Sequence, residues 1–211
     1  MEQLKEFVKT GKAGETVARV SALLEEGVNP EAIMSQALIP AMDEVGDLFQ
    51  KGEYFVPEML VAARAMQQGL EVLKPRMVAG GIEPAGKVVI GTVNGDLHDI
   101  GKNLVVIALE GAGFEVIDLG INVPPVKFVE AVNEHKPQVL GLSALITSTM
   151  WAMKDTVDAI KAAGLDVKIM IGGAPVCQEF ADEIGADFYG VDSTSGRNYA
   201  REVVTIMNTG L

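Results

Sequence analysis

The sequence predicts an α/β protein in which a helical bundle over residues 1–85 precedes a five-stranded parallel sheet with helices over residues 86–211. Apolar residues recur at helical spacing in the first region, whereas strand-like and helix-like runs alternate in the second. Between them lies "AGGIEPAG", residues 79–86, whose Gly, Pro and Ala content is typical of a linker. These three observations indicate two domains of different class.

The first region contains four helix signals. A short helix is expected at residues 2–10, and "ETVARVSALLEEG" places its apolar side chains on one face of a second helix. Asn29 and Pro30 supply an N-cap and a first-turn proline for a third helix, and Pro57 opens a fourth over "PEMLVAARAMQQGLEVLKPRMV". Four helices joined by short connections are typical of a four-helix bundle.

The second region contains five strand-like runs: "KVVIGTV", "EVIDLG", "QVLGLSA", "VKIMIGG" and "DFYGV". Helix-like runs begin near Asp99, Pro124, Thr149, Pro175 and Thr194. Repeats of strand, helix and strand form a parallel sheet, and such sheets bind ligands at the carboxyl ends of their strands. We therefore expect the functional residues directly after strands, in "NGDLHDIG", "SALITST" and "GGAP".

Composition limits the classes of partner. The net charge is −12 and the basic residues are scattered, so we expect no nucleic-acid partner. No apolar run approaches the roughly 20 residues that span a bilayer, so we expect no membrane partner. The single cysteine, Cys177, cannot form an internal disulfide, and the N-terminus lacks the apolar stretch of a signal peptide. These features predict a cytoplasmic protein.

His98, one of two histidines, follows the first strand in "NGDLHDIG". In a purely structural interpretation, a neighbouring aspartate satisfies its ring, or the ring caps the next helix. In a functional interpretation, Asp96 accepts a hydrogen bond from one imidazole nitrogen and leaves the other for a metal ion or a proton. The residues alone leave both interpretations open.

The sequence lacks the residues that other common kinds of site require. A zinc site needs three or four ligands, and the second histidine, His135, lies at the end of a predicted helix, where it is interpreted as a surface residue. The chain has no G-x-S-x-G nucleophile turn, and no phosphate-binding glycine loop follows a strand. A metal bound by one histidine would have to bring its other ligands, as the cobalt of a corrin does.

Three segments in order carry a resemblance to a known family. "DLHDIGKN" resembles the Asp-x-His-x-x-Gly signature of cobalamin-binding domains, "SALITST" resembles that family's segment after the third strand, and "GGAP" resembles its paired glycines. The helical region with "YFVPEMLVAARAM" is similar to the cap of methionine synthase and of the corrinoid proteins of methyltransferase systems. The resemblance covers nearly the whole chain and implies a Rossmann-like, flavodoxin-like cobalamin-binding domain.

The resemblance implies a role for the signature residues. His98 would be the axial ligand to the cobalt of cobalamin or a related corrinoid, in place of the cofactor's own base (base-off, His-on). Asp96 would accept a hydrogen bond from the imidazole, and Thr149, where the family commonly has serine, would close this relay. Leu97, Asp99 and Ile100, within the signature, would also contact the cofactor.

The resemblance further implies a binding slot for the displaced nucleotide tail of the cofactor. Its implied residues follow the first, third, fourth and fifth strands: Gly101, Ser143, Leu145, Thr147, Gly172, Gly173, Tyr189 and Asp192. Ser193 stands where the family's Tyr-Gly-x-Asp-Ala segment has alanine.

The implied function is that of a corrinoid protein in one-carbon metabolism. It would carry a methyl group on cobalt from a substrate-specific methyltransferase to a second methyltransferase that acts on a thiol or a tetrahydrofolate-type acceptor. A reductive activator of the corrinoid would be a further partner. The chain shows no pocket of catalytic residues that would activate a methyl donor, so it would not complete the reaction alone.

The sequence leaves several points open. The donor can be a methylamine, methanol or an aryl methyl ether, and the lower base of the corrinoid and the oligomeric state are not determined. One alternative function is a cobalamin-binding sensor, which would be expected to add a basic helix-turn-helix if it regulated transcription. The other is the small subunit of an adenosylcobalamin-dependent mutase, which would not be expected to carry the helical cap.

Overall fold

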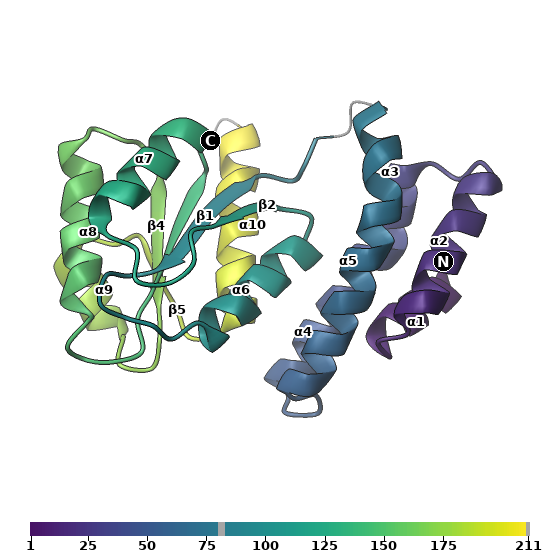
Figure 1. Ribbon diagram of the computed structural model, residues 1–211, viewed down its shortest axis with the longest axis horizontal. Coiled ribbons are helices and arrows are strands. Elements are labelled where there is room, and N and C mark those ends of the chain that lie inside the picture. Colours follow the sequence, from purple (N-terminus) through teal and green to yellow (C-terminus); the bar gives the residue numbers. More distant parts are fainter. Residues whose placement is uncertain (80–82, 210–211) are drawn as a thin grey trace. The chain divides into compact units, whose positions relative to one another are not determined.

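The computed structural model describes residues 1–79 and 83–209 of the chain (Figure 1). The chain divides into two compact units: a helical unit, Met1–Pro84 with Glu110–Gly113, and a sheet unit, Ala85–Leu109 with Phe114–Leu211. Three residues of the predicted linker, 80–82, lie outside the described residues.

The helical unit contains the four predicted helices. They are α1 (Glu2–Lys9), α2 (Ala13–Glu25), a third helix made of α3 (Pro30–Ile33), the π-helical segment η1 (Met34–Leu38) and α4 (Ile39–Gln50), and α5 (Val56–Ala79). Asn29 caps α3 as predicted, since its side chain accepts a hydrogen bond from the Glu31 N–H at 2.9 Å. The wide turn η1 precedes Pro40, which has no N–H for an α-helical bond and whose ring displaces the carbonyl four residues earlier.

The sheet unit contains the five predicted strands, all parallel. They are β1 (Lys87–Thr92), β2 (Glu115–Asp118), β3 (Val139–Ser143), β4 (Lys168–Gly172) and β5 (Phe188–Gly190), in the order β2-β1-β3-β4-β5. This is the flavodoxin-like order, so the predicted fold class is confirmed. The helices are α6 (Ile100–Gly111), α7 (Pro125–His135), α8 (Trp151–Ala162), α9 (Gln178–Ile184) and α10 (Ser193–Thr209).

The two faces of the sheet differ in what covers them. Figure 1 shows α7, α8 and α9 on one side and α6 and α10 on the other. Val89, Leu142 and Ile171 belong to the apolar core on the first side, together with residues of α7, α8 and α9. Side chains alternate along a strand, so Ile90, Ser143 and Met170 face the α6 and α10 side. Phe188 stacks on Tyr199 of α10 at a ring distance of 4.3 Å.

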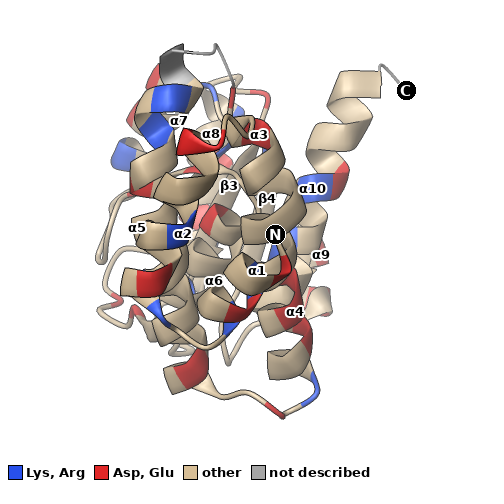
Figure 2. Cartoon of the chain, turned by 90° about the vertical axis from the view of Figure 1, so that its right-hand side faces the viewer, with Lys and Arg blue, Asp and Glu red and all other residues tan. Residues whose placement is uncertain are grey.

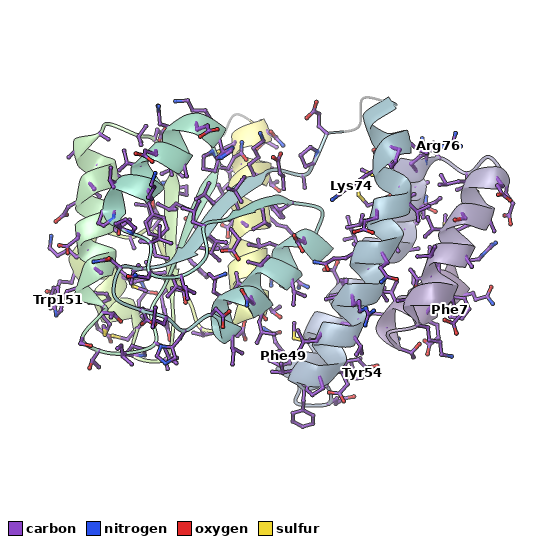
Figure 3. The ribbon with its side chains drawn as sticks, in the orientation of Figure 1. Phe7, Phe49, Tyr54, Lys74, Arg76 and Trp151 are labelled. Atoms are coloured by element: carbon purple, nitrogen blue, oxygen red, sulfur yellow. The ribbon has the colours of Figure 1, made fainter. Side chains whose placement is uncertain are left out.

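The distribution of charged and apolar residues over the structure is close to what the sequence suggested. Lys and Arg appear in Figure 2 as short separate segments on several elements. None of the described helices is long and apolar enough to cross a bilayer. Trp151 begins α8 (Figure 3) and is about half exposed, with its ring edge-on to Phe180 at 5.6 Å.

Candidate functional site

The loop after β1 is fixed by backbone hydrogen bonds around Asp96. The Asp96 N–H donates to the Val93 carbonyl at 3.1 Å, and the Asp96 carbonyl accepts from the Asn122 N–H at 2.9 Å. Thr92 Oγ1 donates to the His98 carbonyl at 2.9 Å. These bonds hold the Asp96 side chain at the carboxyl edge of the sheet, where it is fully buried.

Four donors meet the Asp96 carboxylate. Oδ1 accepts from the His98 N–H at 3.0 Å and lies 2.8 Å from His98 Nδ1. Oδ2 accepts from the Leu145 N–H at 2.8 Å and from Thr149 Oγ1 at 2.6 Å. Since an ionised carboxylate only accepts hydrogen bonds, Nδ1 carries the imidazole proton and Nε2 keeps its lone pair. The predicted contacts of Asp96 with His98 and Thr149 are therefore present in the structure.

The hydroxyl of Thr149 has two acceptors within reach. Thr149 Oγ1 lies 2.6 Å from Asp96 Oδ2 and 2.9 Å from the Ile146 carbonyl. A hydroxyl has one proton, and the bond to the charged acceptor is both shorter and stronger. Thr149 thus holds the carboxylate from the loop after β3.

The charge of Asp96 is stabilised inside the protein. Burial alone would raise the pKa of this carboxyl group, but the hydrogen bonds from Thr149, from the His98 and Leu145 N–H groups and from the His98 ring outweigh it. The pKa of Asp96 is held well below its usual range. A fixed negative charge therefore lies behind the imidazole at neutral pH.

The His98 ring bridges the buried carboxylate and the surface. Its side chain is 50% exposed, whereas that of Asp96 is 0% exposed. Nε2 forms no hydrogen bond with any residue that the structure describes. The ring is thus oriented at Nδ1 and open at Nε2, which is the arrangement of a metal-binding histidine with a carboxylate behind it.

Large apolar side chains are exposed on the loops and at the start of α6 at this edge of the sheet. They follow β1, β2, β3 and β5: Leu97, Ile100, Ile121, Leu145, Ile146 and Val191, each between 41% and 71% exposed. Several exposed apolar residues at one edge indicate a binding surface for an apolar ligand. Leu97, Ile100 and Leu145 are among the residues that the sequence predicted to contact a cofactor.

A row of small residues crosses the sheet at the same edge, on the α6 and α10 side. Thr92 pairs with Ser143, Ser143 with Gly172, and Gly172 with Gly190. A Cβ at Gly172 would lie 3.2 Å from the Gly190 carbonyl, and a Cβ at Gly101 of α6 would meet no atom within 4 Å. Of the predicted slot residues, Ser143, Gly172 and Gly101 therefore line one side of the sheet.

Other predicted residues have structural explanations. Gly173 has a φ of +135°, and a Cβ there would lie 1.7 Å from the Ala144 carbonyl oxygen, so the loop after β3 is what requires this glycine. Tyr189 packs against the core on the opposite side of the sheet from Gly101. Asp192 caps α10, because its Oδ1 accepts from the Ser195 N–H at 2.7 Å.

The remaining predicted residues lie on the loops. Asp99 and Thr147 are exposed, and Asp99 Oδ2 accepts a hydrogen bond from Asn103 Nδ2 at 3.2 Å.

Sequence reasoning missed a buried ion pair beside the site. The Lys102 side chain is 2% exposed, and its Nζ donates to Asp118 Oδ2 and, at 2.8 Å, to Asn103 Oδ1. The pair ties the first turn of α6 to the end of β2, so it supports the loop that carries His98. The only sequence signal for this pair is the presence of a lysine directly after Gly101. The signal is weak, because a lysine is almost never fully buried unless it is paired, and the sequence alone does not show the partner.

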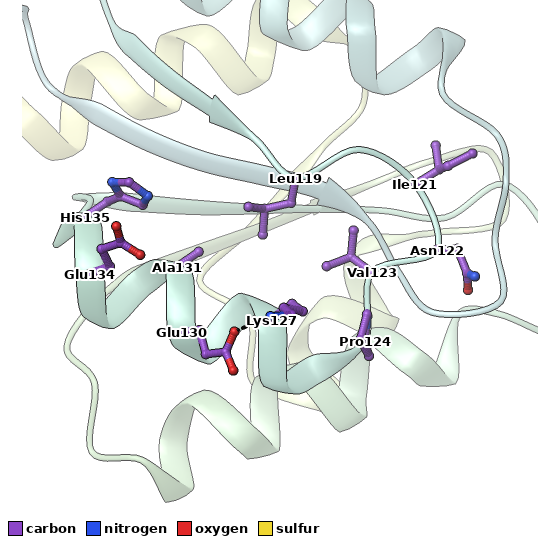
Figure 4. A pocket seen from close by; sticks show the side chains of 10 residues that line it. All are labelled: Leu119, Ile121, Asn122, Val123, Pro124, Lys127, Glu130, Ala131, Glu134 and His135. Atoms are coloured by element: carbon purple, nitrogen blue, oxygen red, sulfur yellow. Dashed lines mark hydrogen bonds and ion pairs between the residues drawn. The ribbon is translucent and has the colours of Figure 1, made fainter.

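A hollow of about 330 Å³ lies beside α7 and shares Ile121 with the exposed apolar residues at the carboxyl edge of the sheet (Figure 4). It is lined by the loop after β2 and by α7 residues that include His135 and the ion pair of Lys127 with Glu130 at 2.7 Å. None of the predicted site residues lines it. Over residues 1–79 and 83–209, no group of three or more His, Cys, Asp or Glu side chains could hold a metal ion.

Comparisons with known proteins match both regions of the chain. The B12 binding domain matches residues 86–196, and a second B12 binding domain matches residues 1–74. Trimethylamine corrinoid protein 1 of Methanosarcina acetivorans is 44% identical over 185 residues, covering 86% of this chain and 86% of the relative. Dimethylamine corrinoid protein 1 of the same organism is 41% identical over 207 residues, 97% of each chain.

A solved structure is also similar over most of the chain. The methanol:cobalamin methyltransferase complex of Methanosarcina barkeri contains a chain with a TM-score of 0.88 and 31% identity. The match covers 96% of this chain and 78% of that chain. By these matches, the chain belongs to the family of B12-binding corrinoid proteins.

Proposed function

We propose that this chain carries a methyl group on a corrinoid between a substrate-specific methyltransferase and a second methyltransferase that acts on a thiol or a tetrahydrofolate-type acceptor. The observation that carries the proposal is the Asp96 carboxylate, which accepts from Thr149 and orients His98 so that Nε2 stays open. The family to which the chain belongs and the names of its relatives support this role.

The residues present fit a corrinoid. The macrocycle supplies four nitrogens to its cobalt, so the protein needs to add one ligand, and His98 Nε2 is positioned to be that ligand. Exposed apolar residues on the loops around His98 offer a surface for the macrocycle. The row from Thr92 to Gly190, together with Gly101, leaves room for a nucleotide tail that the histidine displaces.

When bound, the corrinoid supplies a cobalt that can accept and release a methyl group. The chain's own residues control the ligand beneath it. Thr149 and the Leu145 N–H hold the carboxylate, and the carboxylate holds the proton on Nδ1 and increases the electron density at Nε2. When Nε2 takes a proton it can no longer act as a ligand, so the relay links the protonation of His98 to its binding.

The comparisons support particular partners. The relatives named for trimethylamine and dimethylamine favour a methylamine as the methyl donor, and the methanol:cobalamin methyltransferase complex supports a methyltransferase as a binding partner. We further propose an acceptor methyltransferase and a reductive activator as partners, and a cytoplasmic location. The B12 binding match over residues 1–74 supports the carrier over the mutase subunit, which would not be expected to carry the helical region.

The experiment is a transfer assay on the full chain loaded with cobalamin, with a chemical reductant present because the cobalt has to be reduced before it can accept a methyl group. Isotope-labelled trimethylamine or dimethylamine is supplied with the corresponding methyltransferase, and label on the protein-bound cofactor is measured. We expect transfer to the wild type and to His135→Ala, whose histidine lies outside the site, but a strongly reduced transfer to His98→Ala. A chain that takes up no label from either amine or from methanol, and instead retains an adenosyl group until it is illuminated, would support the sensor.

A further inference from the structure

Ser193, the first residue of α10, has a buried hydroxyl group. The residue is 5% exposed, and its Oγ forms no hydrogen bond with any part of the chain that the structure describes. A buried hydroxyl that has lost its water without gaining a partner is unfavourable. Such groups are rare in native proteins, so a ligand atom that accepts a hydrogen bond is a natural partner for this one.

The helix places Ser193 toward the sheet. Ser193, Gly196 and Ala200 are all buried and recur at the spacing of one helical face. At Gly196 this face is closely packed, because a Cβ there would lie 3.7 Å from Val105 Cγ1 of α6 and 3.8 Å from Met170 Sδ of β4. At this level α10, α6 and β4 meet and leave no slot.

Two of these elements, α6 and β4, carry smaller residues nearer the carboxyl edge of the sheet. On α6, Gly101 lies about one turn before Val105, and on β4, Gly172 is the next residue after Met170 that faces the same side. On α10, Ser193 lies about one turn before Gly196. Toward the edge that carries His98, Gly101 and Gly172 thus take the places of Val105 and Met170, so fewer side-chain atoms lie around Ser193 than around Gly196.

We infer that Ser193 Oγ donates a hydrogen bond to the nucleotide tail of the bound corrinoid and makes this chain selective for corrinoids that have such a tail. The inference rests on the proposed function, because it requires a corrinoid whose own base has been displaced by His98. The acceptor is an atom of the ribose phosphate or of the lower base.

Two variants of the full chain test the hydrogen bond. Ser193→Ala removes the hydroxyl, and Ser193→Cys keeps a similar volume with a much weaker donor. Dissociation constants are measured by absorbance for cobalamin, for a cobamide with an adenine lower base, and for cobinamide, which lacks the nucleotide tail. The thermal midpoint of each cofactor-free variant is measured in parallel, and Ser35→Ala, in the helical unit, is the control.

Both variants should bind cobalamin about three- to tenfold more weakly than the wild type, the change expected from one net hydrogen bond. Their affinity for cobinamide should equal that of the wild type, and the thermal midpoint of cofactor-free Ser193→Ala should not fall. An equal loss for both tailed corrinoids would place the acceptor on the ribose phosphate, and a loss for cobalamin that differs from the loss for the adenine form would place it on the lower base. Ser35→Ala should change none of these values.

Three results would overturn the inference: unchanged affinity for both tailed corrinoids, an equal loss for cobinamide, or a lower thermal midpoint of cofactor-free Ser193→Ala that accounts for the loss. The affinities of the wild type for cobalamin and cobinamide distinguish failure of this inference from failure of the proposed slot. If the wild type prefers cobalamin to cobinamide, only the role of Ser193 is wrong. If it binds the two equally, the tail does not occupy the slot, and both the inference and that part of the proposed function are wrong.

Discussion

The two units differ in what they bury. In the helical unit the fully buried side chains of the described residues are apolar except for Thr16, whose hydroxyl bonds to the Lys12 carbonyl of its own helix turn. The sheet unit instead buries two charged groups of the candidate site, Asp96 and Lys102, together with Thr149 and Ser193. Burying polar groups is unfavourable unless they are paired, so they are informative where they gather.

This difference assigns separate tasks to the units. A unit whose interior is largely apolar is stabilised mainly by packing, and any role in function has to come from its surface. The exposed apolar residues Phe55, Leu60 and Val61, at the start of α5, are such a surface. The sheet unit buries the polar groups of the candidate site near the carboxyl edge of its strands. This edge is where we place the corrinoid.

Substituting one glycine in each unit should give the largest contrast. Gly173→Ala in the sheet unit should reduce the free energy of unfolding by about 3 kcal/mol or more, because a Cβ collides with the Ala144 carbonyl in a left-handed conformation. Gly27→Ala in the helical unit also has a positive φ, +79°, but open space, and should lose only about 1 kcal/mol. Chemical denaturation of both variants measures the difference, and equal losses would show that the loop after β3 yields easily.

Removing the helical unit tests the division of tasks. A fragment that begins at Gly86 should fold and bind corrinoid through His98, because it retains the sheet and all of its loops. If the helical unit shields the upper face of the corrin, light should remove the methyl group from the fragment faster than from the full chain. Photolysis rates are compared under identical illumination, with cofactor content and circular dichroism measured first. A folded fragment with normal cofactor content and an unchanged rate would mean that the helical unit does not cover the cobalt.

Changing one buried polar residue in each unit should give a smaller but more specific contrast. Asp96→Asn removes the negative charge behind His98 and should weaken corrinoid binding by about tenfold, as expected for a group behind a metal ligand. The absorbance spectrum of the bound cofactor should also change, since the charge behind the ligating ring is lost. Thr16→Val should leave both unchanged. An absorbance titration that gave identical curves for Asp96→Asn and the wild type would contradict the relay.

The smallest expected effect is an alkaline stability change in the sheet unit. Burial, with smaller contributions from the charges of Asp187 and Glu202, raises the pKa of Tyr199 from 10.0 to about 12. The folded state then binds this proton more tightly than the unfolded chain, so the contribution to stability is complete below pH 10 and is lost as the pH rises toward about 12. Tyr199→Phe keeps the stacking on Phe188 and should lack this slope when unfolding is measured at several alkaline pH values.

The sequence predicted the elements that depend on local patterns. Strand and helix runs alternate clearly after residue 86, and Asp96 lies two residues before His98, a spacing at which the carboxylate reaches the ring within one loop. The π-helical segment η1 within the third helix was not predicted, because the sequence analysis found only the signals that begin this helix, at Asn29 and Pro30. Features that depend on distant parts of the chain were harder to predict.

Long-range contacts account for the residues whose roles were not foreseen. The direction of Tyr189 follows from the phase of β5 in the sheet, and the need for glycine at Gly173 follows from the approach of Ala144. Lys102 reads as a surface lysine until β2 brings Asp118 to it. None of these contacts joins neighbours in the sequence, so no local pattern reports them.

The bond between His98 and cobalt is measured most directly by electron paramagnetic resonance. The full chain is produced with natural histidine and with histidine whose ring carries nitrogen-15, and each form is loaded with cobalamin and reduced to the paramagnetic Co(II) state. If His98 Nε2 is the lower ligand, each cobalt line should be a triplet in the natural protein and a doublet in the labelled one, and His98→Ala should lose this dependence. A triplet that persists in the labelled protein would mean that the cofactor keeps its own base, and His98 would then have to be removed from the cobalt.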